Sequence, residues 1–413
     1  MNPTLFTSVV VCEQSSLVST CARRTGFLSI LSPRFGALWD ATDDDAVRKD
    51  IINLAISKLV NPNRQATLDE HQQLACLAQR VPIEFNSTTY IDQEMERQQV
   101  EGHMRVCLRI DATSETMVTV SASEPLLSEA AYAVMSNESF NVPRAMTLVM
   151  DGFAINKGDR GEFVVMLLFT VARDKCVGPP DRYGCPKSRI IPVHSFLSHH
   201  LFRNRDGLRP LAEDFADSHM YFNHYIKVHE FKGINARSLL HLSTRGAAVL
   251  CANNQEAIDG INPFLYKGTD IRYNNLGLIL WQSKNNAIYT DKPEPSFFTA
   301  MDPYKLAILK EPDKPVPLIK IVFALAAKTP SLNVVRRPPS DVYDAVVYEI
   351  WCAGISQEIL GSVENAQEPT WAALVQASYG WKAIYQGTGE EQALMRLMNP
   401  GAASHEDFWT KWI

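Results

Sequence analysis

The sequence predicts an α/β protein in which helices flank a mixed central sheet. Short apolar runs bounded by turn residues recur through residues 246–328, as expected for buried strands. Longer amphipathic or apolar segments precede and follow them, as expected for helices. The 413 residues suffice for two or three domains, and the hydrophobic fraction of 46% supplies a core of ordinary size.

The first third of the chain is predicted to hold two helices and a pair of strands. A run of aspartates suits the N-terminus of a helix over residues 43–60, and a second helix is expected over 68–81. Two alternating segments within residues 104–123, MRVCLRIDA and ETMVTVSAS, indicate paired strands. Together these elements define an N-terminal α/β region, residues 1–144, to which the sequence assigns no role.

The next region, residues 145–355, is predicted to contain the main sheet. It should open with a strand at 145–153, followed by a buried helix that begins near Arg160, where Asp159 and Glu162 have the spacing of a capping box. An irregular His- and Arg-rich insertion at 175–235 and a helix at 236–245 should follow. Strands are expected at 246–254, 258–266, 277–284, 318–328 and 342–354, and the segment 342–354 could instead be helical. A C-terminal helical covering region is expected at 356–413.

Polar residues stand at the ends of three of these elements. Glu162 lies in the first turn of the predicted apolar helix, Asp259 at the start of one strand, and Gln282 and Lys284 at the end of the next. Because side chains two apart on a strand share a face, Gln282 and Lys284 should point the same way. Carboxylate and amide oxygens suit Mg²⁺ (or Mn²⁺), and a lysine can orient a water or neutralise charge on a phosphate. The sequence therefore predicts a metal site made by Asp259, Gln282 and Glu162, with Lys284 as an additional catalytic residue.

These residues resemble the motif of the PD-(D/E)xK nuclease superfamily, in a Gln-x-Lys variant. That superfamily has a helix bearing Glu, a strand bearing Asp, and a paired strand that ends in Glu, Asp or Gln followed by x-Lys. The corresponding segments here are DRGEFVVMLL, EAIDGINPFLY and LILWQSKN. Neighbouring stretches such as YFNHYIKV are also similar to large uncharacterised fungal families, some of which resemble Crinkler-type nuclease effectors. The resemblance covers roughly residues 150–330 and implies a restriction-endonuclease-like core that cleaves DNA with a divalent metal.

Two features depart from the superfamily pattern and keep a second function open. About 70 residues separate the Glu-bearing helix from the GAAVLC strand, where compact members have a short turn. Gln282 replaces an acid, which removes one negative charge from the metal site, and a capping box alone would account for Glu162. The alternative to an endonuclease is therefore a catalytically inactive relative that binds nucleic acid or a protein.

The insertion carries an excess of basic residues in a chain whose net charge is -6. Lys187, Arg189, Arg203 and Arg205 within it, and Arg245 just beyond it, are expected to face DNA phosphates. An ordinary solvated loop would have the same composition, so this alternative also stays open.

Composition and motifs argue against several other classes. The eight cysteines are scattered without a CxxC pair, which is typical of reduced thiols in the cytosol or nucleus. The N-terminus lacks the basic start of a signal peptide, and no apolar stretch approaches the roughly 20 residues of a membrane span. No GxGxxG, Walker or nucleophile-elbow motif occurs, so no organic cofactor is expected. Nothing in the sequence bears on the oligomeric state.

Overall fold

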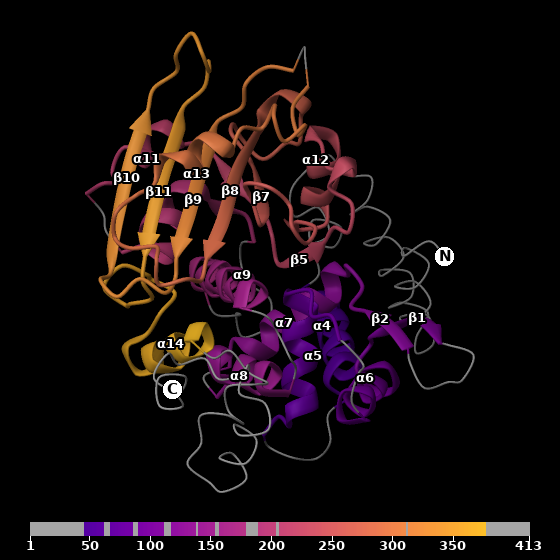
Figure 1. The fold of residues 1–413 in the computed structure, drawn as a ribbon. Coiled ribbons are helices and arrows are strands. Elements are labelled where there is room, and N and C mark those ends of the chain that lie inside the picture. Colours follow the sequence, from indigo (N-terminus) through magenta and orange to yellow (C-terminus); the bar gives the residue numbers. More distant parts are fainter. Residues whose placement is uncertain are drawn as a thin grey trace, which may run out of the picture.

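A mixed sheet with helices on both faces forms the centre of the protein (Figure 1), which confirms the predicted α/β class. The structure is a computed structural model. It describes residues 45–61, 67–85, 90–110, 117–137, 139–152, 157–178, 189–203, 206–310 and 313–376. None of the helices within these ranges is both long and apolar enough to cross a lipid bilayer.

Among the described residues, nine strands form this sheet, in the order β10-β11-β9-β8-β7-β4-β3, with β6 also paired to β7 and β5 paired to β6. Their bounds are β3 Ile191–Pro192, β4 His219–Met220, β5 His224–Lys227, β6 Ala247–Leu250, β7 Gly260–Leu265, β8 Leu276–Lys284, β9 Leu318–Ala324, β10 Ser331–Arg337 and β11 Val347–Ala353. Strand β8 is antiparallel to β7 and parallel to β9. Its first seven residues are buried because the sheet is covered on both sides, which explains the unbroken apolar run in the sequence.

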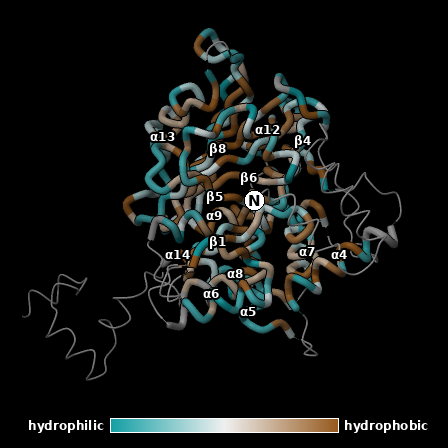
Figure 2. Tube along the Cα trace, turned by 90° about the vertical axis from the view of Figure 1, so that its right-hand side faces the viewer, coloured by the Kyte–Doolittle hydropathy of each residue, from teal (hydrophilic) through white to brown (hydrophobic). Residues whose placement is uncertain are grey.

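The two faces of β8 contact different helices, and this determines where the side chains of its polar end point. Trp281 packs in the core that includes α9 (Lys157–Val177). Leu280 packs in the core that includes α12 (Ala236–Thr244) and α13 (Pro295–Ala300). We call these sides of the sheet the α9 face and the α13 face. Figure 2 shows the hydrophobic residues of β8 and its neighbours in the interior of the chain trace.

Helices of the N-terminal region pack against the α9 side of the protein, below the sheet in Figure 1. They are α4 Asp45–Val60, α5 Glu70–Arg80, α6 Tyr90–Gly102, α7 Pro125–Met135 and α8 Val142–Gly152, and α14 Glu368–Gln376 packs on α8 and α9. Strands β1 Val106–Ile110 and β2 Met117–Val120 form a separate antiparallel pair. Apolar residues of α4, α5, α7 and α8 belong to the same core as α9, so the core is continuous across the predicted boundary at residue 145.

Several predicted elements differ from the structure. The strand expected at 145–153 is wrong, because these residues lie in α8, where Pro143 stands near the start and Met146 and Met150 are buried at helical spacing. Helix α9 begins at Lys157, so Glu162 lies inside the helix and is not part of an N-terminal capping box. The insertion is not irregular throughout, since it supplies β3, β4, β5, a π-helix at Phe196–Leu201 and α11 at Leu211–Asp214.

Candidate functional site

Asp259 lies where the ladder between β7 and β8 ends. Its backbone N–H donates to the Trp281 carbonyl at 2.9 Å. Its carboxylate oxygen Oδ2 accepts hydrogen bonds from the Ser283 backbone N at 2.6 Å and from Ser283 Oγ at 2.7 Å. The next residue, Gly260, is in register with Trp281, and a Cβ there would lie 2.2 Å from the indole ring. The missing side chain at Gly260 therefore permits the close strand approach that holds Asp259 in place.

Glu162 lies on α9, which packs against the same end of β8. A Cβ on its neighbour Gly161 would lie 3.1 Å from Ser283 Oγ, so the helix touches the residue that holds Asp259. The Glu162 carboxylate is partly buried and is electrostatically coupled to Asp259. Within the described part of the chain, no hydrogen bond or ion pair engages this carboxylate.

Both carboxyl groups bind protons more tightly than they would in water. Burial, and then repulsion by Asp259 and Asp159, raises the pKa of Glu162 to about 8, although Lys227 lowers it. Burial also raises the pKa of Asp259, against the effects of the Ser283 hydrogen bonds and of the Lys284 ammonium. Two neighbouring acids whose ionised forms are disfavoured in this way are typical of sites that bind a positive ligand.

Gln282 and Lys284 share a face, as strand alternation predicts, but it is the α13 face. In the parallel register with β9 both stand opposite apolar residues of the α13-face core, whereas Ser283 stands opposite a residue of the α9-face core. The Lys284 ammonium lies 4.8 Å from the centre of the Phe297 ring. Burial lowers the pKa of Lys284, and this effect is larger than the opposing effect of the Asp259 and Glu294 carboxylates. The amide oxygen Oε1 of Gln282 is buried, and no residue that the structure describes donates a hydrogen bond to it.

The structure thus brings Glu162 and Asp259 together and couples Lys284 to Asp259 from the other side of the sheet. It does not bring the Gln282 side chain to the face that carries Glu162. The Ser283 hydroxyl, which the sequence analysis overlooked, is the direct partner of Asp259. Strand alternation could have identified it, because the residue between Gln282 and Lys284 must face α9 once the other two face away. In the ranges that the structure describes, no three His, Cys, Asp or Glu side chains are grouped so that they could hold a metal ion.

Two of the predicted phosphate-facing residues, Arg189 and Arg245, are engaged by other groups of the protein. Arg189 is buried and its Nε lies 3.0 Å from Glu129 Oε2, so it does not face solvent as expected. Arg245 donates to the Ser123 carbonyl and lies 3.5 Å from a Glu124 oxygen. Each arginine neutralises an acid in the protein interior, which the basic composition of the insertion could not reveal.

The remaining members of the predicted basic patch divide into two groups. Arg203 is exposed and lines a cavity of about 300 Å³ together with Ser198, His199 and Gly361. Lys187 and Arg205 lie outside the described residues. Of the three predicted DNA contacts that the structure describes, only Arg203 is therefore exposed.

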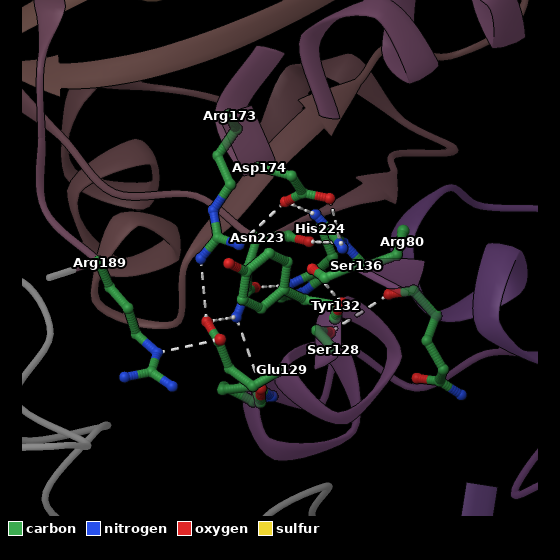
Figure 3. Close-up of polar contacts among 12 residues, drawn as sticks. Arg80, Ser128, Glu129, Tyr132, Ser136, Arg173, Asp174, Arg189, Asn223 and His224 are labelled. Atoms are coloured by element: carbon green, nitrogen blue, oxygen red, sulfur yellow. Dashed lines mark hydrogen bonds and ion pairs between the residues drawn. The ribbon is translucent and has the colours of Figure 1, made fainter. Parts of the chain in front are cut away.

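Arg189 belongs to a buried network of charged groups that joins α7 to α9 (Figure 3). Glu129 Oε1 accepts hydrogen bonds from Arg173 Nη2 at 3.1 Å and from Asn223 Nδ2 at 3.0 Å. Burial acts to raise the pKa of Glu129, but Arg189 and Arg173 outweigh it and lower the pKa to about 2. A buried carboxylate with two guanidinium partners remains ionised, and it ties the C-terminal half of α9 to the N-terminal helices.

The same network extends to α5 and to the start of β5 (Figure 3). Asp174 Oδ1 lies 2.7 Å from Arg80 Nη2 and 3.1 Å from Arg173 Nη1. His224 contacts Asn223 through Nδ1 at 2.6 Å and is fully buried. These contacts fix α9 relative to the sheet, and through α9 they fix the position of Glu162.

Comparison with known proteins gives a family but no function. Neither the curated proteins nor the solved structures contain a match to this chain. One family model matches residues 65–304, a stretch that includes α5 and α13 and every residue of the candidate site described above. The chain therefore belongs to the family described as "Domain of unknown function (DUF8736)".

Proposed function

We propose that the protein hydrolyses phosphodiester bonds in DNA with the help of a divalent cation bound at Glu162 and Asp259. The observation that carries this proposal is the pair itself. Two buried carboxyl groups, from a helix and from a strand end, lie close enough for the Asp259 charge to raise the pKa of Glu162, and no cation of the described chain is hydrogen-bonded to either. The resemblance of the surrounding segments to PD-(D/E)xK nucleases supports the choice of reaction.

The residues present suit magnesium or manganese better than zinc. Carboxylate and hydroxyl oxygens are hard ligands, and Mg²⁺ commonly binds one or two carboxylates while it retains several waters and contacts substrate phosphates. A site with two acids and no third His, Cys, Asp or Glu among the described residues fits that pattern. Zinc sites instead use three or four protein ligands rich in histidine and cysteine. When bound, the cation would supply Lewis-acid activation of water and of the phosphate.

The chain's own residues would orient and balance charge around this cation. Ser283 holds one oxygen of Asp259 through two hydrogen bonds, which fixes the direction of the carboxylate. Glu162 supplies the second anionic oxygen donor from α9. Lys284 favours the ionised form of Asp259 from the α13 face without contact to the cation side. Gln282, expected as a ligand, instead has a buried amide oxygen on that other face.

Plasmid cleavage by the purified chain tests the proposal directly. Supercoiled DNA should be nicked or linearised with Mg²⁺ or Mn²⁺ and remain intact with EDTA. The substitutions Asp259→Asn and Glu162→Gln should each abolish cleavage, since each removes a negative charge while keeping the shape of the side chain. Glu256→Gln is the matched control, because Glu256 is exposed three residues before Asp259 in the same loop. Equal activity of wild type and Asp259→Asn would refute the proposed site.

A second function, binding without cleavage, is favoured by Gln282 and Lys284, whose side chains do not face the two acids. Gln282 contributes no charge, and the Lys284 ammonium packs over an aromatic ring. Both features suit a relative that keeps the fold and binds nucleic acid or a protein without cleaving it. Such a protein would bind DNA with the same affinity in Mg²⁺ and in EDTA, and it would show no cleavage under any metal condition.

A further inference from the structure

The ends of four neighbouring strands meet at the candidate site, and one of them carries a lysine. Strand β5 pairs with β6 so that Lys227 stands opposite Leu250. Backbone hydrogen bonds then continue from strand to strand, from Val228 N to Leu250 O at 2.9 Å and from Cys251 N to Asp259 O at 2.8 Å. Lys227 therefore lies two strands away from Asp259 across the sheet, which corresponds to about 10 Å between the two backbones.

The side chain of Lys227 lies on the α9 face, the face of Glu162. On β5 and β6, Tyr225 and its register partner Ala248 both belong to the α9-face core, and so does Leu250, the partner of Lys227. The Lys227 side chain is only 15% exposed. Its ammonium approaches Glu162 closely enough to influence that carboxyl group. Lys284 is on the opposite face and does not meet these conditions.

A carboxylate from the N-terminal region pairs with the Lys227 ammonium. Glu84, which follows α5, lies 2.5 Å from the Lys227 Nζ and is 46% exposed. His229 Nε2 lies 3.8 Å from the other oxygen of Glu84. Because the Glu84 carboxylate is half in solvent, it can turn into water and release the Lys227 ammonium to another anion.

We propose that Lys227 is the residue that contacts a phosphate of the substrate backbone beside Glu162 and Asp259, and that Glu84 occupies its ammonium until the substrate binds. The inference rests on the proposed function for the identity of the substrate. It replaces Lys284 with Lys227 as the cationic group on the face of the acids. It also gives the N-terminal region a role, because Glu84 and α5 position a residue of the site.

Binding of a fluorescein-labelled DNA duplex, followed by anisotropy over a series of salt concentrations in EDTA, tests this inference apart from cleavage. Lys227→Met should weaken binding several-fold and reduce the slope of log K against log salt by about 1, the loss of one phosphate contact. Glu84→Gln should tighten binding, since it frees the ammonium. Lys232→Met is the matched control, because Lys232 is an exposed lysine five residues away and should leave the slope as in wild type.

The outcomes separate the two proposals. A reduced slope for Lys227→Met without any metal-dependent cleavage by wild type would support the phosphate contact and refute the hydrolase. Cleavage by wild type with an unchanged slope for Lys227→Met would support the hydrolase and refute the phosphate contact of Lys227. Binding that is equally weakened by Lys232→Met, or absent in wild type, would overturn the assignment of Lys227. Thermal melting of each variant excludes a loss of binding through unfolding.

Discussion

Ser283 donates two hydrogen bonds to a single oxygen of Asp259, from its backbone N at 2.6 Å and from its hydroxyl at 2.7 Å. Both reach Oδ2, so the contacts within the described residues leave Oδ1 for another ligand. The arrangement joins β7 to β8 beyond the last pair of the ladder. It also explains how the Asp259 carboxyl group is held in one orientation even though burial raises its pKa.

Removing the Ser283 hydroxyl should therefore reduce both stability and activity. Ser283→Ala loses one hydrogen bond to a carboxylate, at a cost of about 1–2 kcal/mol in the free energy of unfolding. It should also lower metal-dependent cleavage, because Asp259 keeps only the backbone donor. Urea denaturation and plasmid cleavage measure the two effects, with Ser331→Ala on strand β10 as the control. A Ser283→Ala protein as stable as wild type would show that the hydroxyl does not support Asp259.

Lys284 should change the pH at which the site works and should not abolish its activity. The ammonium lowers the pKa of Asp259, so Lys284→Met should raise that pKa and shift the acidic limb of the cleavage profile to higher pH. Activity should recover as the pH rises, because the carboxylate then ionises without help. Cleavage rates measured across pH for this variant and for Lys305→Met, an exposed lysine, provide the comparison. Complete inactivity of Lys284→Met at every pH would instead give Lys284 a direct catalytic role.

The network around Glu129 should matter more to stability than any surface ion pair. Glu129→Gln removes the buried charge that pairs with Arg189 and that Arg173 shares with Asp174, and breaking such a buried pair costs about 3–5 kcal/mol. Chemical denaturation should show this loss. Arg97→Ala is the control, because Arg97 pairs with Glu94 at the surface and its removal should barely move the unfolding midpoint. Similar midpoints for the two variants would contradict a structural role for the network.

Much of the sheet could be predicted from the sequence, because buried strands have a local signal. The apolar run that ends in Gln282 and Lys284 is strand β8, and the segments around it form β6, β7, β9 and β11. The edge strand β10 (Ser331–Arg337) was not predicted, since it is mostly polar and its pairing depends on β11. Residues 145–153 gave a false strand because a short apolar run does not distinguish a strand from a buried helix.

The site was harder to predict than the sheet because its geometry depends on contacts that are distant in sequence. Alternation placed Gln282 and Lys284 on one face correctly, but nothing local indicated which face α9 would cover. The buried position of Arg189 depends on Glu129, which is 60 residues away in the chain. Lys227 lies near Glu162 only because β5 joins the sheet beside β6, a pairing that a Pro- and His-rich segment does not suggest.

His224 should make the folded state sensitive to mild acid. The imidazole is fully buried, and burial first, followed by the charges of Arg245 and Arg80, lowers its pKa to about 3. A histidine in the unfolded chain has a pKa of about 6.5, so between these values the unfolded state binds a proton that the folded state does not. Stability contributed by the neutral ring is therefore complete above about pH 6.5 and is lost as the pH falls, by up to about 1.4 kcal/mol per pH unit.

Denaturation of wild type and variants at pH 7 and at pH 5 tests this slope, because Glu162, whose raised pKa acts in the opposite sense over this range, is the same in every protein compared. The pKa of Glu129 is lowered to about 2. The stability that Glu129 contributes is therefore present above the ordinary carboxyl pKa and is lost as the pH falls from there toward 2, which is below the range of this test. His224→Asn should be less stable than wild type at pH 7, because Nε2 and Nδ1 lose their contacts with Ser123 and Asn223. Its stability should fall less between pH 7 and pH 5, since no imidazole remains to be protonated on unfolding. His229→Asn, at an exposed position, should retain the wild-type slope, and parallel slopes for all three proteins would mean that His224 already carries its proton in the fold.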